Sequence, residues 1–192
     1  MRTDVERWEK KYQRAEAVTS LKPDSLLAKY SNLLKNKGLA LDLAAGTCQT
    51  SVQLAKLINQ VIAVDCSLTA LQLGQRLADN HNVRLHPLVA DLSDWPIPRS
   101  VFDLVTCFRY LDREMFPKME QALKPGGLLI YKTFNEHYVR EAPSFNPNYL
   151  LSAGELTKRF SNLEMIICND GFDSSEIYSF AIARRPKKSD IG

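Results

Sequence analysis

The sequence predicts an α/β protein in which helices cover both faces of a seven-stranded, mostly parallel sheet. Two observations predict it. From residue 39 onward, short apolar runs alternate with amphipathic segments, which is the pattern of parallel βαβ units with strands buried on both faces. The last two apolar runs, residues 163–168 and 177–184, are too close together for a helical crossover, so we expect an antiparallel last strand.

Each element of this alternation has its own signal in the chain. The expected strands are 39–44, 61–65, 84–90, 102–108, 128–134, 163–168 and 177–184. Helices are expected where apolar residues recur at helical spacing, over 49–58, 68–79, 113–123 and 153–160. The stretch Lys124-Pro-Gly-Gly127 is expected to end the helix 113–123, because glycine and proline commonly follow a helix C-terminus.

Two further helices are expected ahead of the first strand. Charged residues separate apolar residues at helical spacing in 3–18, and a second helix over 24–36 should stop at Gly38. A chain of this length is one ordinary domain. The expected division of the single domain 1–192 is cap helices (1–37), a Rossmann-like core (38–185) and a basic tail (186–192).

Composition narrows the class of protein. Hydrophobic residues make up 45% and charged residues 24%, as in globular proteins, and a net charge of +3 is too mild to predict nucleic-acid binding. There is no secretory h-region and no apolar run long enough to span a bilayer, so we expect a cytoplasmic protein without a membrane partner. The four cysteines should be reduced there, and they form no Cys-x-x-Cys pair, so no metal is expected.

Candidate binding residues lie at the ends of four expected strands. Ligands of open parallel sheets bind at the carboxyl ends of the strands. Asp42 is followed by a turn of small residues that ends in Gly46, where a ligand can approach backbone closely. Asp65 ends the second strand, where a carboxylate can accept hydrogen bonds from ribose hydroxyls. Asp91 ends the third strand, and Phe108-Arg109-Tyr110 the fourth.

These residues disfavour a nicotinamide or flavin dinucleotide. The dinucleotide fingerprint requires glycines where this chain has Ala44 and Gln49. The carboxylate of Asp42 would also lie close to a dianionic pyrophosphate and repel it. The same carboxylate suits a cationic or zwitterionic ligand.

The sequence resembles class I S-adenosylmethionine-dependent methyltransferases over almost its whole length. The stretches that carry the resemblance are Leu41–Thr47, Val64–Ser67, Ala90–Leu92, Phe102–Leu111 and Leu123–Ile130. Ala44 and Cys48 stand in place of two glycines of the family's first motif. The resemblance implies S-adenosylmethionine as cofactor, bound by Asp42, Ala44, Ala45, Gly46, Asp65, Cys66, Asp91, Leu92 and Phe108.

Four shorter phrases resemble small bacterial methyltransferases of the tellurite-resistance type. They are Tyr110–Arg113, Tyr131–Phe134, Asn146–Leu151 and Gly154–Leu156. This resemblance implies methyl transfer to a small, polarisable nucleophile such as a thiol, a chalcogen oxyanion or an amine. It names neither the acceptor nor the oligomeric state.

Acceptor-side residues are predicted with alternatives left open. Arg109 and Tyr110 either touch cofactor or substrate or pack at the rim of the sheet, and Trp8 and Tyr12 either dock the first helix or form a lid over the substrate. His137 follows the fifth strand, as a general base or as an ordinary loop histidine.

Other residues and other functions complete the set of alternatives. Cys48, Cys66 and Cys107 lie near the same strand ends, where a core role is the simpler interpretation. Two other functions remain open: a non-catalytic S-adenosylmethionine sensor or partner subunit, and an RNA or protein methyltransferase. Against the latter, Phe108-Arg-Tyr110 stands where base-flipping enzymes carry an Asn-Pro-Pro-Tyr motif.

Overall fold

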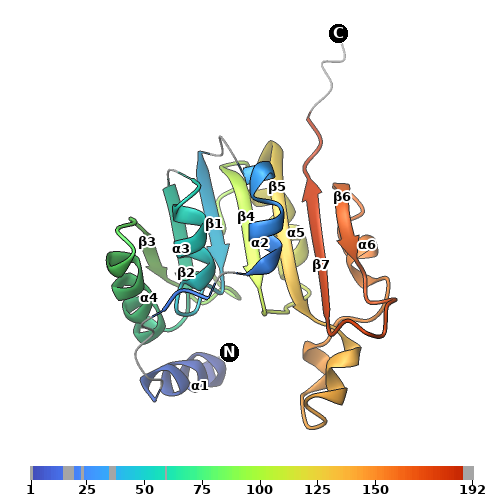
Figure 1. Cartoon of the computed structure of the whole chain (residues 1–192), viewed down its shortest axis with the longest axis horizontal. Coiled ribbons are helices and arrows are strands. Elements are labelled where there is room, and N and C mark those ends of the chain that lie inside the picture. The colour runs from blue at the N-terminus through green and yellow to red at the C-terminus, as the bar shows by residue number, and fades with distance from the viewer. Residues whose placement is uncertain (1, 15–19, 23, 35–37, 59, 188–192) are drawn as a thin grey trace. The chain divides into compact units, whose positions relative to one another are not determined.

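The structure is a computed structural model that describes residues 2–14, 20–22, 24–34, 38–58 and 60–187. The ends of the two expected N-terminal helices and most of the basic tail lie outside the described residues. Of the seven strands, those before residue 97 have the order β3-β2-β1, and those after it have the order β4-β5-β7-β6 (Figure 1). The chain divides into two compact units, Met1–Pro96 and Ile97–Gly192. The expectation of a single domain stays a prediction.

The first unit is a parallel three-stranded sheet with helices. Its strands are β1 (Leu39–Leu43), β2 (Gln60–Asp65) and β3 (His86–Val89), with β2 paired to both of the others. Its helices are α1 (Arg2–Gln13), α2 (Ser25–Lys29), η1 (Ser31–Leu34), α3 (Gln49–Ala55) and α4 (Leu68–Asn80). The three expected parallel strands are confirmed, and α1 is shorter than the expected helix 3–18.

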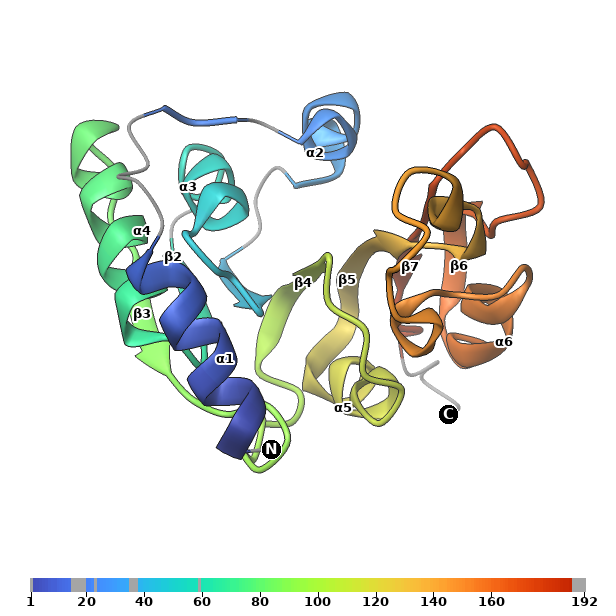
Figure 2. The ribbon, with the colours of Figure 1, turned by 90° about the horizontal axis from the view of Figure 1, so that it is seen from below.

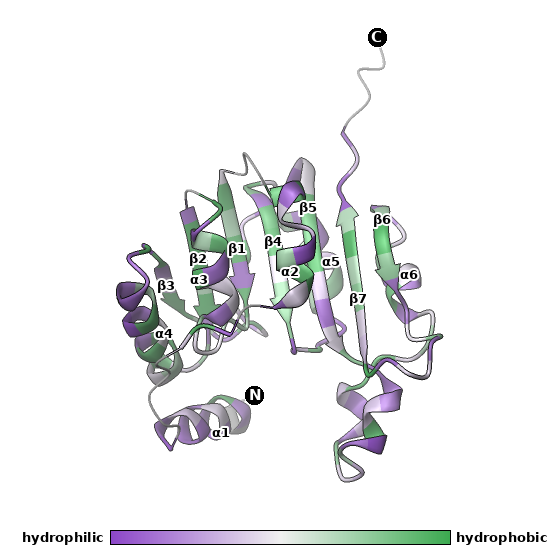
Figure 3. Cartoon of the chain, in the orientation of Figure 1, coloured by the Kyte–Doolittle hydropathy of each residue, from purple (hydrophilic) through white to green (hydrophobic). Residues whose placement is uncertain are grey.

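The helices of this unit differ in hydropathy: α4 buries an apolar face, whereas α1 has few apolar residues. The strands are mainly apolar, whereas α1 is mainly hydrophilic (Figure 3). In α4 the apolar residues Leu71, Leu77 and Ala78 are buried, and Ser67 caps the helix by accepting the amide of Ala70 at 3.0 Å. Helix α1 contacts α4 and lies at the carboxyl ends of the strands of its unit (Figures 1 and 2).

The second unit combines parallel and antiparallel pairing. Strand β4 (Phe102–Phe108) is parallel to β5 (Leu123–Phe134), and β7 (Tyr178–Arg184) is antiparallel to both β5 and β6 (Glu164–Asn169). The expected antiparallel last strand is confirmed. The helices are α5 (Met115–Ala122), η2 (Glu136–Arg140), η3 (Pro147–Tyr149) and α6 (Glu155–Arg159).

Three aromatic rings form the centre of this unit. Tyr131 of β5 contacts Phe116 of α5 and Phe160 at the end of α6, with ring centroids 5.3 and 5.8 Å away. The two phenylalanines meet edge to face at 5.0 Å. All three side chains are buried, so these contacts fix both helices on β5.

The stretch Lys124–Gly127 follows the end of α5, as expected, but it also belongs to a strand. It lies inside β5, which begins at Leu123, directly after α5. Gly126, at φ +80°, donates its amide to Arg185 at 2.8 Å, and the pairing of Phe102 with Leu123 is followed by a register shift. Long-range backbone pairing therefore draws the stretch into the sheet, although its composition is typical of a turn.

Two general properties bear on function. Among the described residues, none of the helices has the length and apolar character needed to cross a membrane. In the same part of the chain, no group of three or more His, Cys, Asp or Glu side chains is arranged to hold a metal ion.

Candidate functional site

The turn after β1 has left-handed backbone at three alternate positions. The φ angles are +52° at Ala44, +53° at Gly46 and +55° at Cys48. Only Gly46 adopts this conformation without steric strain, and a non-glycine residue held there costs about 1 kcal/mol or more. The turn therefore keeps a glycine-type geometry at two positions where the sequence has other residues.

Helix α4 makes room for the unusual cysteine in this turn. The side chain of Cys48 is buried against Gly74, where a Cβ added to the glycine would lie 2.6 Å from the Cβ of Cys48. Burial raises the pKa of the Cys48 thiol well above its usual value. These contacts favour the core interpretation for Cys48, and Gly74 is a residue that the sequence alone did not single out.

Asp65 links the turn to the start of α4. Its Oδ2 accepts the amide of Gly46 at 2.7 Å, and its Oδ1 accepts the amide of Ser67 at 2.9 Å. Burial raises the pKa of the carboxyl group, while these backbone hydrogen bonds oppose the rise. An acidic acceptor thus lies at the carboxyl end of β2, at the position expected for ribose recognition.

Asp42 lies on β1, which continues to Leu43 before the turn begins. Its side chain is 1% exposed and accepts the hydroxyl of Ser51 in α3 at 2.5 Å. The carboxylate is therefore beneath the turn, where it ties β1 to α3. Its direct contact with a ligand stays a prediction.

The remaining cofactor candidates of the first unit also follow the strand ends. Ala45 donates its amide to Val64 at 2.9 Å, and Cys66 is half-buried, which raises the pKa of its thiol to about 11. Asp91 accepts both the amide and the hydroxyl of Ser93, at 3.0 and 2.7 Å, so it also caps a local turn. Leu92 beside it is buried.

The N-terminal segments lie over this turn and α3. The phenol oxygen of Tyr12 would be 2.7 Å from a Cβ placed on Gly46, and the ring of Trp8 stacks on Tyr12 with centroids 6.0 Å apart. Farther along, Gln49 accepts the amide of Lys22 at 2.7 Å, which anchors the segment ahead of α2. The sequence pointed to Trp8 and Tyr12, but it contained no signal for Gln49 as an anchor.

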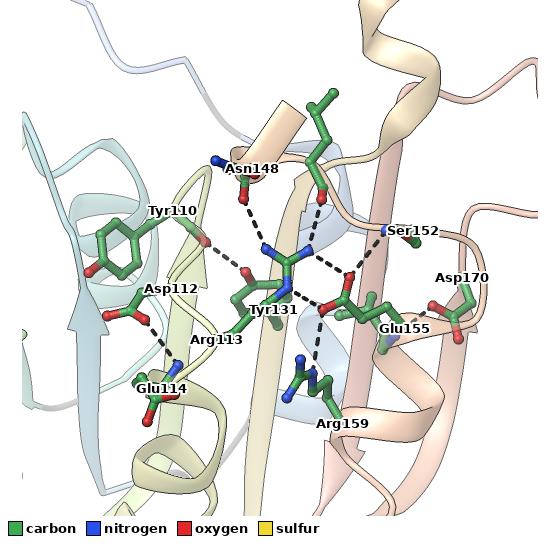
Figure 4. A network of polar contacts seen from close by, with 12 residues as sticks. Tyr110, Asp112, Arg113, Glu114, Tyr131, Asn148, Ser152, Glu155, Arg159 and Asp170 are labelled. Carbon is green, nitrogen blue, oxygen red and sulfur yellow. Dashed lines mark hydrogen bonds and ion pairs between the residues drawn. The ribbon is translucent and has the colours of Figure 1, made fainter. Parts of the chain in front are cut away.

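In the second unit, the loop after β4 is held in a strained conformation. Phe108 is buried and Arg109 is exposed with φ +58°. The amide of Arg109 donates to the carbonyl of Lys132 at 2.8 Å. The hydroxyl of Tyr131 donates to the carbonyl of Tyr110 at 2.7 Å (Figure 4). Backbone strain of this kind is concentrated at ligand-binding sites.

Arg113 connects three of the four sequence phrases, and the fourth joins them through the hydrogen bond from Tyr131 to Tyr110 (Figure 4). Its Nε and Nη2 contact the two carboxylate oxygens of Glu155 at 2.7 and 2.9 Å. Its Nη1 and Nη2 also donate to the carbonyls of Asn148 and Leu150, at 2.9 and 3.1 Å. The phrases were visible in the sequence, but the pairing of Arg113 with Glu155, 42 positions later, was not.

His137 contacts a different part of the second unit. Its Nε2 lies 3.0 Å from the carbonyl of Gly171, in the connection between β6 and β7, and its amide donates to Asn135 Oδ1 at 3.0 Å. The carbonyl requires the tautomer that carries its proton on Nε2. This contact favours the loop-histidine interpretation over a free general base.

The cofactor side as a whole fits a nucleoside without a pyrophosphate. Gly46 lies in a left-handed turn beneath the phenol of Tyr12. Two acidic residues lie at the ends of neighbouring strands, since Asp65 ends β2 and Asp91 follows β3. These groups can accept hydrogen bonds from ribose hydroxyls and an amino group, whereas they would repel phosphate.

Comparisons with known proteins agree with this geometry. Residues 40–127 match a family model described as a methyltransferase domain. Demethylmenaquinone methyltransferase of Clavibacter sepedonicus is 36% identical over 101 residues, or 50% of this chain, and the match covers 40% of that protein's length. This chain therefore spans less than half of that relative.

Solved structures show the same fold. TehB from Haemophilus influenzae has a TM-score of 0.70 at 14% identity, covering 93% of this chain and 67% of the other. N-methyltransferase NodS from Bradyrhizobium japonicum WM9, in complex with S-adenosyl-L-homocysteine, has a TM-score of 0.66 at 15% identity, covering 96% and 98%.

Proposed function

We propose that this chain, which matches a methyltransferase domain over residues 40–127, is a class I enzyme that uses S-adenosylmethionine to methylate a small-molecule nucleophile. The acceptor classes are thiols, chalcogen oxyanions and amines. The observation that carries the proposal is the Gly46–Asp65 hydrogen bond at 2.7 Å, which joins a left-handed turn to an acidic ribose acceptor.

The cofactor-binding residues we assign come from the ends of four strands. Backbone of Ala44, Ala45 and Gly46 would face the methionine part, and because Gly46 has no side chain the phenol of Tyr12 can lie directly over the turn. Asp65 would accept from the ribose. The other assigned residues are Asp42, Cys66, Asp91, Leu92 and Phe108.

Residues beside the methyl acceptor would orient the nucleophile and exclude water. S-adenosylmethionine, when bound, supplies a methyl group activated by its sulfonium. Trp8 and Tyr12 would cover the cofactor, and Arg109 and Tyr110 would flank the acceptor, because backbone hydrogen bonds hold their loop rigid. A soft anionic nucleophile needs no base, so His137 can keep its contact with Gly171.

A turnover screen tests this proposal. Purified protein would be incubated with S-adenosylmethionine carrying a labelled methyl group and with a thiol, selenite or tellurite, an amine, a phenol or an isoprenoid naphthoquinol. Transfer to one of these supports the proposal, and the last arm tests the chemistry that the relative's name implies. RNA and protein pools are included. Labelling of a pool alone, or cofactor binding without any transfer, would overturn a small-molecule methyltransferase in favour of the other two functions.

The place of action follows from the same proposal. The four cysteines are all free, and three of them are buried or half-buried near the proposed site or the core of β4. Free thiols are typical of reducing compartments. We therefore assign the chain to the cytoplasm, with a small molecule rather than a membrane as its partner.

A further inference from the structure

Helix α1 is attached to α4 through one carboxylate. Oε2 of Glu9 accepts the hydroxyl of Ser67 at 2.6 Å, and Oε1 accepts the hydroxyl of Thr69 at 2.5 Å. The amide of Thr69 adds a longer contact at 3.4 Å. Hydrogen bonds from the two hydroxyls lower the pKa of Glu9, so the group accepts in its charged form at neutral pH.

Hydrogen bonds connect Glu9 of α1, through Ser67 and Asp65, to the Gly46 turn. Ser67, which donates its hydroxyl to Glu9, donates its amide to Asp65 at 2.9 Å. Asp65 in turn accepts the amide of Gly46 at 2.7 Å. Tyr12, three residues after Glu9 on the same helical face, brings its phenol oxygen over Gly46. One helix therefore contacts both ends of the Gly46–Asp65–Ser67 unit.

On α1, Glu9 makes the hydrogen bonds to Ser67 and Thr69 at the start of α4. Glu6 and Lys10 are exposed, and Lys11 lies over the ring of Trp8, 4.2 Å from its centroid. Figure 3 shows that α1 is mainly hydrophilic, and its Val5, Trp8 and Tyr12 are half-buried, so their contacts hold the helix together with the Glu9 carboxylate. Charge-assisted hydrogen bonds are about twice as strong as neutral ones, which suits a single anchoring carboxylate.

We propose that Glu9 is a positioning residue for the cofactor: by fixing α1 on the start of α4, it holds Tyr12 over the Gly46 turn. Binding of the cofactor and docking of α1 are then coupled. The inference rests on the proposed function, because it takes the Gly46 turn as the place where the cofactor binds. Glu9 itself acts through Tyr12 and does not need to touch the ligand.

Calorimetric titration with S-adenosylhomocysteine tests the inference. Glu9→Gln keeps the size of the side chain and removes its charge, and should weaken binding about tenfold. Thr69→Val removes one hydroxyl donor and keeps the shape of the residue. If Glu9 acts through Thr69, the double variant should lose less affinity than the product of the two single losses. The matched control is Glu6→Gln on the exposed face of α1, which should bind as the wild type does.

A second readout separates positioning from overall stability. Amide hydrogen exchange of α1 should slow when S-adenosylhomocysteine is added to the wild type, and the protection should be lost in Glu9→Gln while the exchange of β1 and β2 is unchanged. The inference is overturned if wild type and Glu9→Gln bind equally, or if α1 shows no ligand-dependent protection. Failure of the wild type itself to bind would overturn the proposed function too, and that outcome is read from the first titration.

Discussion

Arg113 and Arg159 both contact the carboxylate of Glu155, but in different ways. Arg113 engages both oxygens, at 2.7 and 2.9 Å, and two backbone carbonyls as well, whereas Arg159 makes one contact of 3.4 Å within its own helix. A planar guanidinium can make this forked set of bonds and a lysine cannot. The two arginines therefore form a matched pair for asking what the network contributes.

Arg113→Lys should lower the free energy of unfolding by about 1–3 kcal/mol, because hydrogen bonds of a charged donor are lost from a partly buried site. Arg159→Lys should change it by less than about 0.5 kcal/mol, as exposed pairs one helical turn apart usually do. Urea denaturation of both variants measures the difference. Equal destabilisation of the two variants would mean that the additional hydrogen bonds of Arg113 do not contribute to the free energy of unfolding.

A second pair, Cys48 and Gly74, is in direct packing contact. Gly74→Ala would place a methyl group against the side chain of Cys48 and should destabilise the protein by about 1–3 kcal/mol. Adding Cys48→Gly removes the obstacle and relieves the left-handed residue at φ +55°. Thermal and urea unfolding of the two single variants and the double variant should therefore show that the second change rescues the first. Additive losses would contradict this packing explanation.

The raised pKa of Asp65 predicts how pH affects both stability and binding. The folded carboxyl binds its proton more tightly than an unfolded aspartate, because burial penalises the charge. Between the unfolded and folded pKa values, the contribution of Asp65 to stability therefore falls as pH rises. Ribose recognition uses the charged form, so affinity for S-adenosylhomocysteine should fall as pH is lowered, starting above the usual aspartate range near 4.

Binding titrations with S-adenosylhomocysteine at several pH values test whether affinity falls with decreasing pH while the contribution of Asp65 to stability rises. Asp65→Asn should bind more weakly at neutral pH, and its affinity should lose the acid-side decline that the wild type shows. Circular dichroism at each pH separates loss of binding from unfolding. The same decline in wild type and variant would show that another group is responsible.

Local patterns were sufficient to predict most of the sheet. Strands that are buried on both faces consist mainly of apolar residues, so the alternation of apolar runs with helical segments predicted the set of strands. The short connection between the last two runs predicted the antiparallel pair. The end of the helix before Lys124–Gly127 was predicted correctly, but the inclusion of this stretch in β5 was not, because it depends on hydrogen bonds of Gly126 and Gly127 with the distant Arg185, which no local signal records. The short helices η2 and η3 carry too few residues for a periodic pattern.

The site was predictable where a residue follows a strand, and less so where contacts span the chain. Asp65 ends β2 and Gly46 lies in the turn after β1, as the expected strand ends predicted. Glu9 carried no signal, since its partner Ser67 is 58 positions away, and Gly74 could be recognised only from the cysteine packed against it. Asp42 lies on β1, within the expected strand 39–44, but its hydrogen bond with Ser51 of α3 had no signal in the sequence.

The most direct test of the account is a paired titration of the purified chain with S-adenosylhomocysteine and with NAD under the same conditions. We expect saturable heat with the first and none with the second, because acidic groups and a bare Gly46 accept a ribose and an amino acid but repel a pyrophosphate. Tight binding of NAD with no response to S-adenosylhomocysteine would contradict the assignment of the site.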